Sequence, residues 1–387
     1  MKIKLIILSI LIFAGAYPQT TTSHKIICDG VVHKKIINTI DTLSIDILKI
    51  DFSKNNFELR AVKANNLLND KATTSEMVSA LTDSGYNVIA AINADFFETD
   101  GELINNMISN GIFVKAVKFT DSPFNDFVNT QFAVTDNKSF LMEQFVFSGR
   151  LILADGVSES INRINSKADS NSITLYNSFQ GELTPQSTHN WYTSKTPLTL
   201  IKNNHDTLYC VVSDSFYHGG NIKINSQYIL SVNNKFAHYL EREIKLGDTL
   251  KIILGFNPIC NNINTLLGGW PRLVKDGINL IKSDSTIEGV FPRFSKTKHP
   301  RTGIGISRDS TTIYFITVDG RQESSSGMSL DDFANLMIEQ GIYQGLNFDG
   351  GGSTTMVINN KVVNSPSDQT GERKVGNCLM LIKKQEN

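Results

Sequence analysis

Cysteine, proline and net charge are all scarce in this sequence, and long apolar runs are absent after its first residues. Among 387 residues there are 4 Cys and 9 Pro, and 37 Lys and Arg balance 38 Asp and Glu, so the formal net charge is -1. Four cysteines are too few for a disulfide-rich scaffold, and the balanced charge argues against a globally basic nucleic-acid binder. With 40% hydrophobic residues, the composition excludes a disordered chain, a collagen-like repeat and a coiled coil, and is typical of a globular protein with a large core.

Residues 1–19 have the pattern of a secretory signal peptide. Lys2 and Lys4 precede an apolar run, and small residues follow at 14–16. The run is short for a membrane span, so we expect cleavage rather than an uncleaved anchor helix. The catalytic unit is then 20–387, without an integral membrane span, and we expect export to the periplasm, the cell surface or the medium.

The four cysteines leave their own role open. Export permits disulfide bonds, but Cys28, Cys210, Cys260 and Cys378 allow three pairings, and their spacing does not select one. They fit equally well as small buried residues. No CxxC pair is present, so a structural zinc site is not expected. No cofactor is required, and any metal is unknown, although the Asp residues allow a divalent cation such as calcium.

Alternating and β-branched stretches predict strands along most of the chain, with two capped helices between them. Thr73 begins a helix that ends at Gly85, and Ser329 begins another that ends at Gly341. Strands are expected in 40–62 as a pair around a polar turn, in 86–92, 140–153, 207–212 and 249–254, and as a hairpin of 301–307 with 311–318. We therefore predict an α+β or mixed α/β fold: a single, β-rich catalytic domain with a mixed central sheet and a few packed helices.

The two helix–strand units repeat one local pattern. Each has a capped helix, a glycine and a strand that ends in Asn-x-Asp, first as Asn93-Ala94-Asp95 and again as Asn347-Phe348-Asp349. A third strand ends in Asp319. Ligands often bind beyond the carboxyl ends of strands, so these acidic ends predict one shared site. The alternative is that Asp simply begins the turn after each strand.

The segment 349–355, Asp-Gly-Gly-Gly-Ser-Thr-Thr, is the strongest local signal. Glycines allow backbone amides to approach a ligand closely, and successive amides can form an anion-binding nest. The hydroxyls of Ser353 and Thr354 add donors. The segment is not a P-loop, because no Lys follows the glycines. A tight hairpin is the alternative interpretation.

Three arginines accompany these carboxylates. Arg301 follows His299-Pro300, Arg321 follows Asp319-Gly320, and Arg373 ends a polar run at 364–373. Arginine binds phosphate or carboxylate in a bidentate manner. A site with both cations and carboxylates suits a substrate in which a phosphate adjoins the bond to be broken. The cations would bind the phosphate, and a carboxylate would help to break the bond. A glycosyl phosphate fits, because its phosphate leaves with the help of cations and its anomeric carbon needs a nearby carboxylate.

At these motifs the sequence resembles the phosphodiester glycosidase family. The resemblance covers residues 93 to 378 and is carried, in the family's order, by segments 93–97, 268–274, 299–302, 318–321, 327–330, 347–354 and 364–373. It implies one α/β catalytic domain that hydrolyses the bond between an alpha-linked sugar and phosphate in a phosphodiester. It does not fix the sugar, for which N-acetylglucosamine is one candidate. Asp95 stands where the family usually has a small residue, so catalysis is not assigned to it, and its role is left as specificity or cation binding.

We assign roles to these residues as hypotheses. Asp349 is the carboxylate at the anomeric carbon, Asp319 orients water or a sugar hydroxyl, and His299 orients Arg301 or donates a proton. The expected partner is a phosphodiester-linked glycan. The residues expected to bind its phosphate and sugar are Arg301, Arg321, Gly351, Gly352, Ser353, Thr354, Asn93, Phe97, Asn347, Asp368, Glu372 and Arg373.

Two other functions compete with this one. A non-catalytic module that binds phosphorylated cell-surface or exopolysaccharide glycans could use the same cations without a placed carboxylate. A phosphodiesterase that cleaves the P–O bond with two metals would need more clustered ligands than the 7 scattered His provide. The sequence leaves the sugar, the group beyond the phosphate, the stereochemical outcome and the oligomeric state open.

Overall fold

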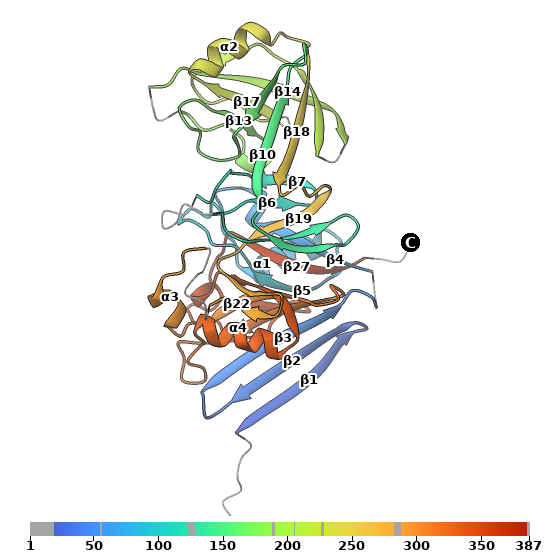
Figure 1. Ribbon diagram of the computed structural model, residues 1–387, viewed down its shortest axis with the longest axis vertical. Helices are drawn as coiled ribbons and strands as arrows, with labels where there is room; N and C mark the ends of the chain where they lie inside the picture. Colours follow the sequence, from blue (N-terminus) through green and yellow to red (C-terminus); the bar gives the residue numbers. More distant parts are fainter. Residues whose placement is uncertain are drawn as a thin grey trace, which may run out of the picture.

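Antiparallel strands make up most of the chain (Figure 1). The computed structural model describes residues 19–54, 56–121, 128–187, 190–204, 206–225, 228–281 and 288–384. Within these ranges there are 27 strands and four α-helices. One strand pairing there is parallel, between β12 (Arg163–Ile164) and β13 (Ile173–Tyr176), and the other ladders are antiparallel. The predicted signal peptide at 1–19 lies, apart from residue 19, outside the described residues.

The predicted α+β or mixed α/β class with a mixed central sheet is therefore wrong, and the fold is predominantly β. The helix–strand repeat misled the prediction. Its two strands, β5 (Val88–Asn93) and β24 (Ile342–Phe348), lie in different sheets, and each pairs antiparallel with its neighbours. A parallel sheet needs successive helical crossovers within one sheet, and the described part of the chain contains no such series.

An eight-stranded sheet forms the platform behind the candidate site. Its order is β1-β2-β3-β23-β22-β24-β20-β21. Arg301 at the start of β22 pairs with Val318 at the end of β23, and Thr302 pairs with Phe348 at the end of β24. The acidic ends Asp319 and Asp349 therefore flank the start of β22. The bounds of the remaining strands are β1 Thr20–Cys28, β2 Val31–Asn38, β3 Leu43–Asp51, β20 Arg272–Lys275, β21 Ile278–Asn279, β22 Arg301–Ser307 and β23 Thr312–Val318.

A five-stranded sheet brings the first Asn-x-Asp end to the second. Its order is β26-β25-β5-β27-β4, and the backbone amide of Asp349 donates to the carbonyl oxygen of Ala94 at 2.8 Å. The expected meeting of the two strand ends is thus observed. The bounds are β4 Phe57–Lys63, β25 Met356–Ile358, β26 Lys361–Val362 and β27 Asn377–Lys383.

The predicted strand pair in 40–62 is half correct. Both strands form, as β3 and β4, but they do not pair with each other. β3 pairs with β2 and β23, whereas β4 pairs with β27. The turn between them therefore leads from one sheet to another, and the local alternation could not reveal this.

A second lobe at the top of Figure 1 is built from a nine-stranded sheet. It rests on a further five-stranded sheet, and their facing sides share one apolar cluster that includes Phe113, Phe256 and Leu266. A separate cluster joins the eight-stranded sheet to both five-stranded sheets and contains Leu48, Leu379 and Phe132. The lobe strands are β10 Val146–Ile152, β11 Ser158–Ile161, β14 Thr193–Asn204, β15 Thr207–Val212, β16 Tyr217–His218, β17 Tyr228–Asn233 and β18 Thr249–Asn257, with β12 and β13. The supporting strands are β6 Met107–Ser109, β7 Ile112–Lys115, β8 Gln131–Thr135, β9 Phe140–Glu143 and β19 Ile263–Gly268.

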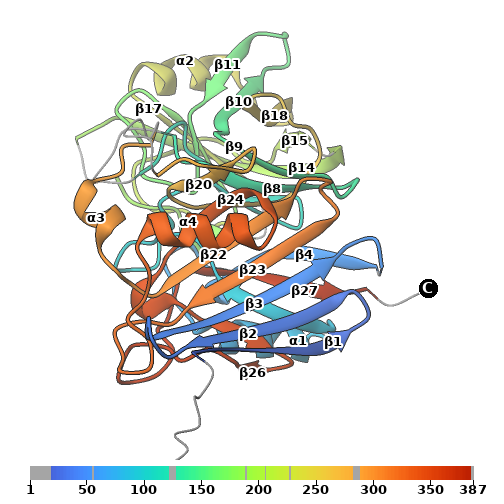
Figure 2. The same cartoon turned by 60° about the horizontal axis from the view of Figure 1, so that its bottom comes forward.

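The two predicted helices are confirmed with their caps. Thr73 and Glu76 form a capping box at α1 (Thr74–Asp83), and the Ser329 hydroxyl accepts from the backbone amide of Asp332 at α4 (Leu330–Glu339). Figure 2 shows α4 lying over the eight-stranded sheet, where it contacts β20 and β24. Two further helices are α2 (Lys235–Glu243) and α3 (Pro292–Lys296).

Two smaller questions concern the pairing of the cysteines and the presence of a helix that could cross a membrane. All four cysteines are unpaired, and Cys210 and Cys378 are buried, as their interpretation as small buried residues expects. Among the described residues, none of the helices has the length and apolarity that a membrane crossing requires.

Candidate active site

A cavity of about 840 Å³ lies where the two Asn-x-Asp strand ends meet. Aromatic rings form much of its wall, and two carboxylates and three cations lie among them. Its lining residues are Lys71, Phe96, Phe97, Glu98, Thr99, Ile104, Asn129, Trp270, Phe291, Phe294, Asp349, Arg373 and Lys374. Three of the predicted site residues, Asp349, Phe97 and Arg373, therefore line the same cavity.

Asn93 links the backbone of Asp349 to Thr302 and Thr355. The Asn93 side-chain amide donates to the carbonyl oxygen of Asp349 at 2.6 Å. Its own oxygen accepts from the Thr302 hydroxyl at 2.8 Å and from the backbone amide of Thr355 at 3.1 Å. Asn93 is fully buried, so the structure places it behind the cavity, where it joins three strands.

Burial raises the pKa of the Asp349 carboxyl to about 6. The nearby Ser353 hydroxyl and the charges of Arg373 and Arg321 oppose this rise without cancelling it. A buried carboxyl resists ionisation because the charged form loses its hydration. Asp349 is therefore charged at neutral pH but changes its protonation within the weakly acidic range, which is typical of functional carboxylates.

The glycine segment after Asp349 lets two guanidinium groups approach the backbone. Gly351 has a φ of +61°, and a Cβ there would lie 3.1 Å from Nη1 of Arg321. A Cβ on Gly352 would lie 2.1 Å from Nη2 of Arg373 and 2.2 Å from Oδ1 of Asp368. Any larger residue at 352 would displace this pair, so close approach explains the glycines.

Three backbone amides of this segment donate to carbonyl oxygens of the protein. The amide of Gly351 donates to the carbonyl oxygen of Pro300 at 2.9 Å. The amide of Ser353 donates to the carbonyl oxygen of Gly350, and the amide of Thr354 donates to the carbonyl oxygen of Gly351, each at 3.2 Å. The segment is not a hairpin, because β24 and β25 do not pair. The segment forms a short 3₁₀ turn, Gly351–Ser353, against which the guanidinium groups of Arg321 and Arg373 lie.

Arg373 is held by the carboxylate of Asp368. Its Nε and Nη2 donate to the two carboxylate oxygens at 2.8 and 2.9 Å, a bidentate geometry that fixes the plane of the guanidinium. The neighbouring Glu372 faces the other way and accepts from the Ser75 hydroxyl and from the backbone amide of Ser75 at 3.1 Å. Glu372 therefore anchors this loop to the first turn of α1.

His299 and Arg321 form a contact on the far side of the glycine segment. Nη2 of the exposed Arg321 lies 3.1 Å from Nδ1 of His299. An arginine can only donate, so Nδ1 accepts and the ring proton of the neutral imidazole is on Nε2. Burial, together with the charges of Arg301 and Arg321, lowers the pKa of His299, which favours this neutral form.

Arg301 is buried, with only 2% of its surface exposed. Its guanidinium donates to the carbonyl oxygens of Met328 and Thr297, each at 2.9 Å. The group also lies 5.3 Å from the centre of the Phe294 ring, which lines the cavity. Burial lowers the pKa of Arg301 to about 10. The structure thus places the predicted phosphate clamp behind the aromatic wall.

Asp319 is likewise turned towards the protein. Its carboxylate accepts from the Ser44 hydroxyl at 2.9 Å, from the Asn364 side-chain amide at 3.1 Å and from the backbone amide of Ser365 at 2.9 Å. Burial raises its pKa, and these hydrogen bonds oppose the rise. Asp319 therefore ties β3 to the loop after β26 and does not line the cavity.

Two predicted residues that do not line the cavity, Asn347 and Thr354, are buried and have unpaired polar atoms. Asn347 donates from its side-chain amide to the carbonyl oxygen of Trp270 at 2.7 Å. Within the described part of the chain, its buried Oδ1 has no partner, and neither has the hydroxyl of Thr354. These atoms are available to ordered water or to a ligand that reaches them.

Trp270 is a cavity residue to which the sequence analysis gave no role. Its ring stacks on Phe294 with centroids 4.9 Å apart and meets Phe96 edge-on at 6.3 Å. The glycine-rich segment 268–274 contained the signal, because two glycines before a Trp-Pro pair allow close packing. Only the fold reveals that this segment reaches the cavity.

Asn129 is a second missed residue, and no local pattern pointed to it. It lines the cavity while only 3% of its surface is exposed, and its Oδ1 has no partner among the described residues. Its amide donates to Oδ1 of Asn105 at 3.0 Å, and the amide of Asn105 donates to Asp95 at 2.7 Å. Asp95 thus orients Asn129 through Asn105. Burial raises the pKa of Asp95 to about 7.

Metal ligands do not cluster in the described ranges: no group of three or more His, Cys, Asp and Glu side chains there is arranged to hold an ion. The calcium ion that the sequence allows stays a prediction.

The comparisons with known proteins agree with the resemblance that the motifs carry. Residues 206–382 match the family model described as phosphodiester glycosidase. The mouse enzyme N-acetylglucosamine-1-phosphodiester alpha-N-acetylglucosaminidase is 33% identical over 110 residues, which is 27% of this chain and 21% of that protein. The SPbeta prophage-derived uncharacterized protein YomE of Bacillus subtilis (strain 168) is 41% identical over 84 residues, 22% of this chain and 13% of that protein. The match therefore spans about a fifth or less of each relative.

Two solved structures share the fold. A hypothetical protein from Synechocystis has a TM-score of 0.71 and 18% identity, covering 96% of this chain and 65% of that one. A protein of Burkholderia pseudomallei K96243, whose name suggests export, has a TM-score of 0.70 and 16% identity, covering 94% of this chain and 96% of that one. At such identities these structures support the architecture alone.

Proposed function

We propose that this chain, in which residues 206–382 match the phosphodiester glycosidase family model, hydrolyses the bond between an alpha-linked sugar and phosphate in a glycosyl phosphodiester. The observation that carries the proposal is Asp349, a carboxylate with a raised pKa in a cavity walled by aromatic rings and bordered by cations. N-acetylglucosamine is the first sugar to test, because the mammalian relatives act on it by name.

The aromatic rings of the cavity are evidence for a sugar-binding site beside Asp349. Phe96, Phe97 and Trp270 line the cavity, and the apolar face of a pyranose ring packs well on such rings. The unpartnered Oδ1 of Asn129 is placed to accept from a sugar hydroxyl or from an N-acetyl N–H group. Asp95 and Asn105 behind it would fix the direction of that acceptor.

The cations of the cavity are evidence for a phosphate-binding site in the same cavity. Arg373, Lys374 and Lys71 line the same cavity, and Asp368 holds the plane of the Arg373 guanidinium. Positive groups beside a departing phosphate stabilise the charge that develops on it. Arg321 and His299, on the far side of the glycine segment, would extend this positive surface.

In the proposed step, the bond between the anomeric carbon and the phosphate oxygen breaks, and its electron pair remains on the phosphate. The ionised Asp349 stabilises the positive charge that develops on the anomeric carbon, either as a nucleophile or as the base for water. One water supplies the hydroxyl of the released sugar and one proton to the medium. Arg301 and Asp319 act as positioning residues that hold the aromatic wall and the strand edge.

The rest of the chain is assigned with this activity. We propose that 20–387 form the catalytic unit and that 1–19 direct its export, on the residue pattern given above. A phosphodiester-linked glycan of a cell envelope or exopolysaccharide is then the substrate class.

Hydrolysis in oxygen-18 water tests the proposal. The protein is incubated with N-acetylglucosamine-1-phosphate methyl diester and with the corresponding glucose and galactose diesters. Label in the released sugar supports C–O cleavage by a glycosidase. Label in the phosphate product instead, whether methyl phosphate or the sugar 1-phosphate, would assign P–O cleavage and overturn the proposal. Saturable binding of a diester without any turnover would favour the non-catalytic glycan-binding module.

A further inference from the structure

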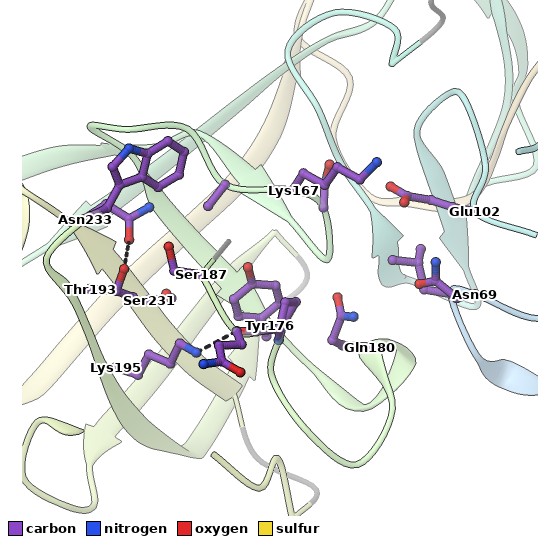
Figure 3. A pocket seen from close by; sticks show the side chains of 16 residues that line it. Asn69, Glu102, Lys167, Tyr176, Gln180, Ser187, Thr193, Lys195, Ser231 and Asn233 are labelled. Atoms are coloured by element: carbon purple, nitrogen blue, oxygen red, sulfur yellow. Dashed lines mark hydrogen bonds between the residues drawn. The ribbon is translucent and has the colours of Figure 1, made fainter. Parts of the chain in front are cut away.

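A second cavity, of about 360 Å³, lies between the lobe and the body of the protein (Figure 3). Strands β13, β14 and β17 provide Tyr176, Thr193 and Asn233 on the lobe side. Asn69 and Glu102 close it from the other side, and Figure 3 shows both facing the lobe residues across the opening. None of its lining residues belongs to the set proposed for catalysis.

The wall of this cavity combines aromatic rings with neutral polar groups. Tyr176 and Trp191 supply rings, and the amides of Asn69, Gln180 and Gln186 supply paired donors and acceptors. Serine and threonine hydroxyls lie between them. Rings that cover an apolar face, with amides around the edge, match a neutral pyranose and its hydroxyl groups.

The charges at the second cavity are mostly engaged within the protein. Nζ of Lys195 donates to the Thr184 hydroxyl at 3.0 Å and to two backbone carbonyl oxygens at 2.7 and 2.6 Å. Glu102 pairs with the buried Lys115 at 2.8 Å. Lys167 is exposed at the rim. This differs from the first cavity, where Arg373 and two lysines line the wall together, so the second cavity suits a neutral ligand better than a phosphate.

The two cavities share one wall. Asn69 lines the second cavity and donates to Asp100 at 2.5 Å, while Lys71, two residues later, lines the first and donates to the carbonyl oxygen of Thr99 at 2.5 Å. The same two short segments, 69–71 and 98–102, therefore border both cavities. A chain of linked sugars could pass over this wall.

We propose that the second cavity binds a neutral sugar unit of the glycan whose sugar-phosphate end occupies the Asp349 cavity. The identity of that glycan end rests on the proposed function, whereas binding of a neutral saccharide does not. The second cavity would thus select substrates by chain length, through sugars remote from the bond that breaks.

The two tryptophans of the chain allow a direct test, because one lies in each cavity. In the Trp270→Phe variant, Trp191 is the remaining tryptophan and its fluorescence reports on the second cavity. Neutral tetrasaccharides of N-acetylglucosamine, glucose, mannose and galactose are titrated, followed by inorganic phosphate. We expect a saturable change with at least one saccharide and a midpoint raised about 10-fold by Gln186→Ala.

A matched control is Tyr217→Ala, which removes an exposed ring of the same lobe that does not line the cavity. It should leave the midpoint unchanged. No saturable response to any tetrasaccharide, or a response to phosphate alone, would overturn the proposal.

A kinetic comparison separates this proposal from the proposed function. Trp191→Ala should raise KM about 10-fold more for a tetrasaccharide phosphodiester than for the monosaccharide diester. Equal changes for both substrates would contradict the second subsite while leaving the glycosidase in place. Saccharide binding at Trp191 without hydrolysis of any diester would retain the second cavity and reject the glycosidase.

Discussion

The two Asn-x-Asp strand ends share a pattern and lie side by side, yet they are used differently. The carboxylate of Asp95 accepts from the backbone amide of Phe96 at 2.8 Å and from the side-chain amide of Asn105 at 2.7 Å. The carboxylate of Asp349 lines the cavity instead. Asp95 is buried and is followed by two phenylalanines, whereas Asp349 lines the cavity and is followed by glycines. The neighbouring residues, rather than the motif, decide which carboxylate can meet a ligand.

The largest difference between the two ends should be in turnover. Asp349→Asn should reduce kcat on a glycosyl phosphodiester at least ~1,000-fold, because the neutral amide cannot stabilise or attack the anomeric carbon. Circular dichroism should show an unchanged fold. A variant that keeps more than a tenth of wild-type turnover would remove Asp349 from the centre of the reaction.

Stability should change with pH at the same residue. The pKa of Asp349 rises on folding from an ordinary value near 4 to about 6, so the folded protein binds the proton more tightly and loses stability as pH rises through this window. Asp349→Asn, which resembles the protonated form, should be more stable than wild type by up to about 3 kcal/mol at pH 8. At pH 3 the two should be equal.

Urea unfolding at several pH values measures this effect. A stability difference between Asp349→Asn and wild type that is constant from pH 3 to pH 8 would contradict the raised pKa.

Arg373 tests the positive side of the cavity. Arg373→Ala should lower kcat/KM on the diester about 100-fold through loss of phosphate stabilisation. Arg242→Ala removes an exposed arginine of α2 that pairs with Glu243 and should have no effect. Equal losses in the two variants would point to a general charge effect instead of a site.

Asn129 tests the connection between the two ends. Asn129→Ala removes the unpartnered Oδ1 at the cavity and should raise KM about 10-fold for a sugar that donates to it. A sugar diester that lacks the corresponding donor group should be affected far less. The same increase for both substrates would show that Asn129 only supports the wall.

Asp95 should show the smallest effect. Asp95→Asn keeps the shape of the side chain and most of its contacts to Asn105, so turnover should stay within about threefold of wild type. A loss comparable with that of Asp349→Asn would mean that the two ends act as one carboxylate pair, and the contrast between them would fail.

The locally encoded parts of the structure could be predicted from the sequence. Thr73 and Ser329 cap their helices through residues only three positions away. β22 and β23 pair as an antiparallel hairpin around the short turn that joins them. Asp349 could be recognised because the strand before it and the glycines after it are adjacent in the sequence. In such cases the deciding contacts lie within a few residues.

The remainder depends on partners that are distant in the sequence. Asp319 is turned inward by Ser44, which precedes it by 275 positions, and Arg301 is bound by backbone carbonyls that any sequence could offer. Asn129 is oriented by hydrogen bonds through Asn105 to Asp95. The antiparallel order of the sheets has the same origin, because strands that follow similar helices can join different sheets.

The position of β27 affects how the protein is made. This strand, the last in sequence order in the described chain, inserts between β5 and β4 and pairs Cys378 with Asn93. Asn93 is the residue that fixes the backbone of Asp349. During synthesis β4 and β5 therefore have unpaired edges until β27 has been translated. Such exposed edges are prone to mispairing. Activity should appear only after translation of this strand, so chains truncated before residue 377 should be inactive.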